Sequence, residues 1–197
     1  MSKNFDYSSL EVSRELEDEM KNAVKIGEGH NGIVFLLSHN RSVKFFRRHQ
    51  SWIDEAYILK RVRGSRFFPR IHEIGDNYIV RDYVEGQRLD KYLKNHKMDK
   101  ILAREIYDMI CEFNRLRFKR LDIRCKDLFY NTETCKLMVI DPKKNYIKRV
   151  TYPRHLMKGL WKRGVLEEFL ELIKDIDREK AIYWKYKIKR YLVYNKK

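Results

Sequence analysis

The segment KIGEGHNGIVFLL, residues 25–37, concentrates glycine in a pattern that could bind phosphate. Gly27, Gly29 and Gly32 are three of the eight glycines in the chain. This spacing lets backbone N–H groups approach a phosphate, although a tight turn alone could also use it. A Rossmann dinucleotide site needs a helix next, and the apolar run IVFLLS follows instead. We therefore predict a hairpin over a nucleotide, with Val34 packing on adenine; a generic glycine-rich hairpin is the alternative.

A lysine in the next apolar run is the second chemical signal. Lys44 lies inside SVKFF, where an ammonium group is costly to bury unless it meets an anion. Glu55 follows in a helical stretch, and an ion pair between the two would hold the ammonium against nucleotide phosphates. Asp54 and Glu73 are rival partners, and an exposed Lys44 on an edge strand is the alternative.

A sheet and a helix must position these residues. Short alternating apolar runs punctuated by glycine, asparagine and polar turns predict an antiparallel sheet, with strands at residues 23–26, 33–38, 42–46, 70–73 and 77–82. The stretch SWIDEAYILKRV predicts a helix inside this region, with Ser51 as its N-cap. The first twenty residues predict a surface helix that packs through Leu10, Val12 and Leu16.

After Gly86 the apolar period becomes helical, so the fold class is α+β. DKILAREIYDMICEFNRLRF predicts one buried helix face, formed by Ile101, Leu102, Ile106, Met109, Ile110 and Phe113. A loop with two short strands follows at 122–140, and the C-terminal part is helical again. Its predicted core residues are Leu156, Leu160, Trp161, Leu166, Phe169, Leu170 and Ile173, and the last helix is predicted to dock through Ile182, Tyr186, Ile188 and Leu192.

Composition limits the classes of protein. With 197 residues, 43% of them hydrophobic, the chain can build one compact domain or two small lobes. Its apolar runs are too short to span a bilayer and its first residues are unlike an export signal, so we expect a cytoplasmic protein with no membrane partner. Its three cysteines, with no CxxC pair, predict reduced thiols.

Charge is unevenly distributed along the chain. The formal net charge is +16, and residues 141–197 carry 17 Lys/Arg against 7 Asp/Glu. A surface of this kind predicts an anionic partner of the basic C-terminal region, such as an acidic protein, RNA or the ribosome, and the aromatic residues of KAIYWKYKIKRYLVYNKK suit stacking on single-stranded nucleic acid. A solvated basic face without a dedicated ligand is the alternative.

Together, the glycine-rich hairpin, the VK strand, the helix glutamate and the following YIVRDYVEGQRLDKYL resemble the protein kinase-like superfamily. The resemblance implies a bilobal fold within a single domain, 1–197, with a helical extension at 1–21, a β N-lobe at 22–84 and a reduced helical C-lobe at 85–197. It also implies that backbone groups of Asp82–Val84 contact adenine. Arg81 occupies a position where most kinases keep an apolar side chain.

The resemblance extends to the middle loop, RLDIRCKDLFYNTETCKLMVIDPKK. It implies that Asp122 orients or deprotonates the attacking hydroxyl and that Arg124 lies near the transferred group. Asp127 and Asp141 would hold Mg²⁺, or Mn²⁺, through oxygen ligands, and Lys44 would contact the phosphates of ATP. The alternative is that these are ordinary turn-capping aspartates.

Several positions depart from the kinase pattern. RLD replaces His-Arg-Asp, Asp127 replaces an asparagine, DPK replaces Asp-Phe-Gly, and only 56 residues follow Asp141. Minimal bacterial kinase-like proteins and RIO-type atypical kinases are therefore the better comparisons. We predict an ATP-dependent serine/threonine-protein kinase. The alternatives are a RIO-like ATPase or small-molecule phosphotransferase, and a non-catalytic kinase-like (pseudokinase) or RNA/ribosome-binding module.

The start of the first C-terminal helix adds two polar residues. Arg154 and His155 follow Pro153 there. Exposure to solvent is the default expectation for both, and contact with substrate or phosphate is the alternative.

Overall fold

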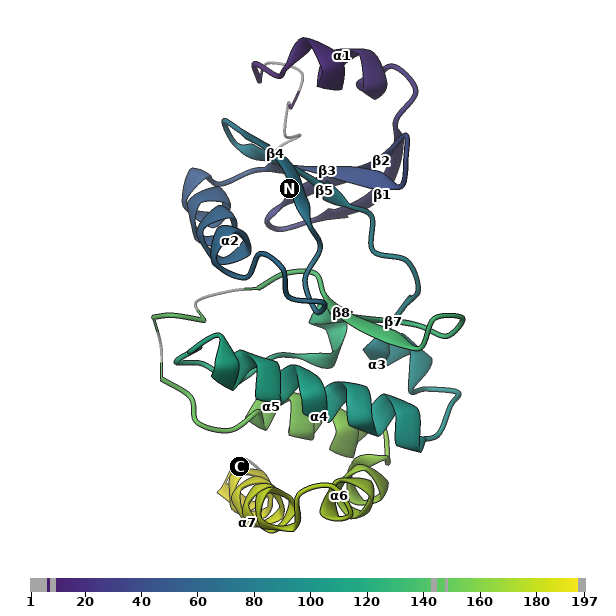
Figure 1. Ribbon diagram of the computed structural model, residues 1–197, viewed down its shortest axis with the longest axis vertical. Coiled ribbons are helices and arrows are strands. Elements are labelled where there is room, and N and C mark those ends of the chain that lie inside the picture. Colours follow the sequence, from purple (N-terminus) through teal and green to yellow (C-terminus); the bar gives the residue numbers. More distant parts are fainter. Residues whose placement is uncertain (1–6, 8–9, 143–144, 148, 195–197) are drawn as a thin grey trace. The chain divides into compact units, whose positions relative to one another are not determined.

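The computed structural model describes residue 7 and residues 10–142, 145–147 and 149–194 (Figure 1). The chain divides into two compact units. Unit one comprises Met1–Gly64 and Phe68–Val84, and unit two comprises Ser65–Phe67 and Glu85–Lys197. Lys143 of the DPK motif and the last three residues of the basic tail lie outside the described residues.

Unit one is built on an antiparallel five-stranded sheet, as the alternating sequence pattern predicted. Its strands are β1 (Val24–Gly29), β2 (Gly32–Leu37), β3 (Arg41–Phe46), β4 (Ile71–Gly75) and β5 (Tyr78–Asp82), in the order β1-β2-β3-β5-β4. The helices are α1 (Arg14–Met20) and α2 (His49–Arg61), and α2 contacts β3, β4 and β5 (Figure 1).

Alternation along the strands gives this sheet one hydrophobic face. Apolar side chains of β2, β3 and β5 pack there with Leu16 of α1: Ile33, Phe35, Leu37, Val43, Phe45, Tyr78 and Val80. The intervening residues, including Val34 and Lys44, therefore point to the opposite face. Because one face of the sheet is buried, the pairing register of its strands is fixed, and this register places Lys44 on the other face.

Two helix starts differ from the sequence prediction. Helix α1 begins only at Arg14, because the Ser13 hydroxyl accepts a hydrogen bond from the Leu16 N–H (3.3 Å), and residues 10–13 are not helical. Helix α2 begins at His49 with Arg48 as N-cap, so the predicted cap at Ser51 is wrong. The Ser51 N–H already bonds to the Arg48 carbonyl (2.9 Å), which places Ser51 inside the first turn.

Unit two is mainly helical, with a small sheet. The helices are α3 (Leu89–Tyr92), α4 (Lys100–Arg115), α5 (Arg154–Lys162), α6 (Leu166–Lys174) and α7 (Arg178–Tyr194), and a 3₁₀ turn, η1, spans Cys125–Asp127. The antiparallel strands β6 (Gln87–Arg88), β7 (Leu128–Asn131) and β8 (Lys136–Val139) form the sheet. Within the described residues, no helix combines the length and apolarity that crossing a membrane requires.

Helix α4 forms the core of unit two. Its N-cap Asp99 accepts a hydrogen bond from the Leu102 N–H (2.8 Å), and the predicted face is fully buried except for Ile101. Ile101 is 55% exposed because, at 100° per residue, it lies more than a quarter turn from the centre of the buried face.

The C-terminal helices dock through a different set of residues than predicted. Helix α7 packs on α5 and α6 through Ala181, Trp184 and Ile188. Of the predicted docking residues, Ile188 is buried, whereas Ile182 and Tyr186 are exposed. Trp161 is also exposed, while the other predicted core residues of α5 and α6 are buried. The mixed basic and aromatic sequence of α7 leaves its buried face poorly defined by periodicity alone.

Candidate functional site

The predicted nucleotide-binding residues of unit one form a row across the sheet. Gly27 is opposite Val34 in the β1–β2 pair, and Val34 is opposite Lys44 in the β2–β3 pair. Directly opposed residues share a face, so the three positions lie side by side on the face away from the hydrophobic cluster. The turn between β1 and β2 thus belongs to the same surface as the Lys44 side chain.

Lys44 is buried and paired with the helix. Its Nζ lies 2.5 Å from Glu55 Oε2, and both side chains are less than a tenth exposed. The ammonium also lies 4.5 Å from the centre of the Phe46 ring. The rival carboxylates bond elsewhere: Asp54 accepts from the Gln50 amide (2.8 Å), and Glu73 accepts from the Tyr78 hydroxyl (2.5 Å).

Arg81 shares the same carboxylate. Its Nη1 lies 3.0 Å from Glu55 Oε1, and it is buried on β5. The arginine at the position where most kinases are apolar is therefore a second cation on Glu55. The signal was present in the sequence, because an arginine inside the apolar run YIVRD carries the same burial cost as Lys44.

Packing requires only one of the three hairpin glycines. A Cβ at Gly32 would lie 1.9 Å from the Phe45 carbonyl oxygen, which no side chain tolerates. A Cβ at Gly27 would meet only Val34 Cβ at 3.9 Å, and one at Gly29 would have no neighbour within 4 Å. Packing therefore explains why residue 32 is a glycine. It does not explain the glycines at positions 27 and 29.

Backbone groups at the end of β5 are partly committed. The Asp82 N–H donates to the Arg70 carbonyl (2.9 Å), and the Tyr83 N–H donates to the Asn40 carbonyl (2.9 Å). Among the described residues, no group accepts a hydrogen bond from the Val84 N–H. Of the segment predicted to face adenine, Val84 thus keeps a donor for a ligand, whereas the Asp82 N–H is used within the unit.

In unit two, Arg124 and the predicted metal ligands form one charged cluster. The Arg124 guanidinium bonds to both oxygens of Asp127, at 2.5 and 2.7 Å, and the Ile140 N–H donates to the Asp127 carbonyl (3.0 Å), next to Asp141. The Asp127 hydrogen bonds raise the pKa of Arg124 above its ordinary value; burial opposes this, and the charges of Asp141 and Asp122 add to it.

Asp122 is buried at the start of α5. Its Oδ1 accepts a hydrogen bond from the His155 N–H (2.7 Å). Its Oδ2 contacts the His155 ring Nδ1 and lies 3.3 Å from Arg154 Nε, and the side chain has no exposed surface. Because the Pro153 N-cap offers no side-chain cap to α5, Asp122 supplies one from a distant loop. Arg154 and His155 therefore contact a predicted site residue rather than only solvent.

No family model matches the chain. A curated protein of Bacillus subtilis (strain 168), named "Putative serine/threonine-protein kinase YrzF", is 26% identical over 132 residues. The match covers 64% of this chain and 61% of the Bacillus protein, so the chain spans less than two thirds of that relative's length.

A solved structure, the PK-1 kinase of Cydia pomonella granulovirus, has a TM-score of 0.51 with 18% sequence identity. The structural match covers 64% of this chain and 53% of the viral chain. The fold is protein kinase-like. The resemblance seen in the motifs is thus confirmed at the level of fold: an antiparallel sheet with its helix in unit one, and mainly helices in unit two.

The donor atoms that Asp127 and Asp141 present in unit two suit a magnesium ion. Asp127 and Asp141 offer carboxylate oxygens, which Mg²⁺ prefers, and each Asp127 oxygen has a lone pair left beside its bond to Arg124. Across the described ranges, no group of three or more His, Cys, Asp or Glu side chains could hold a metal ion. Since Mg²⁺ commonly binds through one or two carboxylates, waters and substrate phosphates, this donor set suits a nucleotide-bound ion.

The η1 turn that carries Asp127 packs closely on α5, and this contact yields a prediction. A Cβ at Gly159 would lie 2.5 Å from Cys125 Sγ. The sulfur is buried at this contact, and burial raises the pKa of the Cys125 thiol to about 12. We expect Gly159→Ala to cost about 1–3 kcal/mol of unfolding free energy through overpacking, despite alanine's higher helix propensity.

A double-mutant cycle in urea checks this prediction. Cys125→Ala removes the obstructing sulfur, so Gly159→Ala should cost markedly less in that background. Equal costs in both backgrounds would contradict the proposed contact.

Proposed function

We propose that the chain is an ATP-dependent protein kinase that transfers the γ-phosphate to a serine or threonine hydroxyl. The observation that carries the proposal is the buried Lys44–Glu55 ion pair on the sheet face that also presents Gly27 and Val34. A buried ammonium held by a helix carboxylate suits contact with nucleotide phosphates. The backbone of the β1–β2 hairpin would donate N–H groups to these phosphates, and Val34 and the Val84 N–H would contact adenine.

The charged cluster of unit two would supply the remaining parts. Asp127 and Asp141 would hold Mg²⁺, which when bound neutralises phosphate charge. Arg124, kept protonated by Asp127, would stabilise negative charge on the transferred group. Asp122 would accept a hydrogen bond from the attacking hydroxyl and so orient it. Both Asp122 oxygens already accept bonds from α5, so this role requires Oδ2 to exchange or share its contact with His155.

That requirement favours a second candidate function, a non-catalytic nucleotide-binding module. Asp122 has no exposed side-chain surface and caps α5, which is a structural role in its own right. A chain with this arrangement could bind ATP through unit one and transfer nothing. A RIO-like ATPase or small-molecule phosphotransferase would use the same groups with another acceptor. The cytoplasmic location and the anionic partner of the basic C-terminal region stay predictions.

Two measurements test the proposal on the full chain. Mg²⁺-ATP should raise the melting temperature, since a ligand at 100 times its Kd stabilises the folded state by about 2.7 kcal/mol. Radiolabelled γ-phosphate should then appear on hydroxyl groups of the chain itself or of a carrier protein. A melting shift without transfer supports the non-catalytic module; release of free phosphate alone supports an ATPase; no shift contradicts nucleotide binding altogether.

The glycines give a sharper prediction for ATP binding. Gly29→Ala should leave the melting temperature without ligand nearly unchanged, because nothing lies within 4 Å of the added Cβ. It should weaken Mg²⁺-ATP binding about tenfold, or about 1.4 kcal/mol, by placing a side chain where the backbone meets phosphate.

Gly32→Ala is the matched control for this prediction. It should lower the melting temperature without ligand, because its Cβ collides with the Phe45 carbonyl. If Gly29→Ala destabilised the ligand-free protein as much as Gly32→Ala, the glycine at 29 would serve packing rather than ATP.

A further inference from the structure

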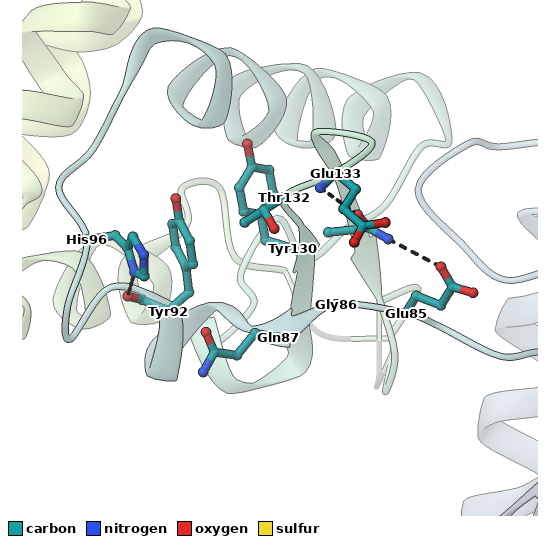
Figure 2. A pocket seen from close by; sticks show the side chains of 9 residues that line it. Glu85, Gly86, Gln87, Tyr92, His96, Tyr130, Thr132 and Glu133 are labelled. Atoms are coloured by element: carbon teal, nitrogen blue, oxygen red, sulfur yellow. Dashed lines mark hydrogen bonds between the residues drawn. The ribbon is translucent and has the colours of Figure 1, made fainter.

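A hollow of about 380 Å³ lies in unit two beside α3 and the β7–β8 turn (Figure 2). No lysine or arginine lines it, although 44 of the 197 residues are Lys or Arg. Two other hollows of the described structure do contain basic residues. Lys119 and Arg149 line one without an acidic residue, and the other mixes two arginines with two glutamates. The formal charge of the hollow at the β7–β8 turn is thus negative, whereas that of the whole chain is positive.

Two glutamates give this hollow its negative charge. Glu85 and Glu133 both line it, on the side away from the Tyr92 and His96 rings (Figure 2). Within the described part of the chain, Glu133 has no hydrogen bond or ion pair on its carboxylate, and Glu85 accepts only one long bond, from the Asn131 amide (3.4 Å). Both carboxylates therefore have acceptor capacity for a cation.

The turn that carries Glu133 is held in place. Asn131 Oδ1 accepts hydrogen bonds from the N–H groups of Glu133 (2.9 Å) and Thr134 (3.0 Å), while its amide nitrogen faces Glu85. One side chain thus fixes the turn and links it to Glu85, in the segment before β6. This preorganisation lowers the entropy cost of binding a ligand between the two glutamates.

Aromatic rings form the rest of the wall. The rings of Tyr92 and His96 are stacked, with centroids 4.2 Å apart and planes at 4°, and Tyr92 meets Tyr130 edge-on at 5.2 Å. The His96 ring Nδ1 also lies 3.0 Å from the Tyr92 carbonyl oxygen, which fixes the stack. Rings beside carboxylates are the surroundings in which a cation gains both charge pairing and contact with π-electrons.

We propose that this hollow binds the guanidinium group of an arginine presented by a partner protein. Two carboxylates repel phosphate and other anions, which excludes nucleotides and nucleic acid as its ligands. Arginine suits the hollow better than lysine, because its planar group offers five donors in a fixed fork and stacks on aromatic rings. The proposal rests on the hollow alone and does not depend on phosphoryl transfer.

The test is an NMR titration of the ¹⁵N-labelled full chain at low salt. The probe is a glycine-serine peptide with a single central arginine; matched peptides carry lysine or glutamine instead. We expect saturable shifts of the Gly86 and Asn131 resonances with the arginine peptide, at least threefold weaker binding of the lysine peptide and none of the glutamine peptide. Equal binding of all three would overturn the proposal.

Variants distinguish binding of the peptide in the hollow from an effect of the charge of the whole chain. Glu133→Gln should weaken the arginine peptide at least fivefold, and Glu85→Gln should also weaken it. Glu179→Gln makes the same charge change on exposed α7 and should have no effect. The spectrum of each free variant reports whether the turn keeps its fold. Unchanged affinity in Glu133→Gln, or an equal loss in Glu179→Gln, would overturn the proposal.

Discussion

Glu55→Gln is expected to lower the free energy of unfolding by about 3–5 kcal/mol, because it removes one partner of a buried ion pair. Two buried cations, Lys44 and Arg81, share this carboxylate at 2.5 and 3.0 Å. The substitution preserves the shape of the side chain, so the loss reports charge rather than a cavity. Urea denaturation with an unchanged m-value would measure it as a shift of the midpoint.

Lys44→Met provides the comparison within the same cluster. It leaves Glu55 paired with Arg81 and replaces the lysine stem with an apolar chain of similar length beside Phe46. Its expected cost is therefore smaller than that of Glu55→Gln. Asp54→Asn is the matched control, since it neutralises the neighbouring acid on α2, whose partner among the described residues is Gln50. It should change stability by no more than about 0.5 kcal/mol.

The order of these costs identifies Glu55 as the shared centre of the cluster. Equal losses for Lys44→Met and Glu55→Gln would mean that Arg81 contributes nothing. A loss in Asp54→Asn as large as in Glu55→Gln would mean that the helix, not the ion pair, is the sensitive part. The same folded Lys44→Met protein then serves in the ATP melting experiment, where it should lose most of the shift.

Local patterns in the sequence predicted the sheet of unit one because each strand buries a single face. Alternation of apolar side chains from β2 to β5 is a signal with period two, and glycines and asparagines mark its turns. Helix faces were less certain where apolar and basic residues mix. Ile101 and Ile182 are apolar and exposed, and only the packing of α4 and α7 decides which side is buried.

Pairings between distant residues could not be obtained in the same way. The sequence offered Asp54 and Glu73 as rivals of Glu55, and only the crossing of α2 over β3 and β5 selects Glu55. The contact of Asp122 with His155 spans 33 residues and depends on where α5 begins. Sequence order can assign a kinase-like role to Asp122, but it cannot reveal that a helix terminus already uses the carboxylate.

Asp122→Asn tests that carboxylate directly. If the chain is a kinase, this variant should transfer γ-phosphate about 10²–10⁴-fold more slowly, the range in which a positioned acid or base contributes. The Mg²⁺-ATP melting shift should persist, because the nucleotide contacts proposed for unit one are untouched. The fold should also weaken by about 1.5–3 kcal/mol, since Asn replaces a charged acceptor of the His155 and Arg154 bonds.

The loss of stability must be distinguished from the loss of phosphoryl transfer, and the chain offers a matched control. Asp177 also caps a helix, accepting a bond from the Lys180 N–H at the start of α7 (2.9 Å), and it lies outside the charged cluster. Asp177→Asn should therefore cost stability without slowing transfer. If both variants slowed transfer alike, the effect of Asp122→Asn would be that of a weakened unit two. If the unsubstituted chain bound ATP and transferred nothing, capping of α5 would be the role that explains Asp122, since both of its oxygens accept bonds from that helix.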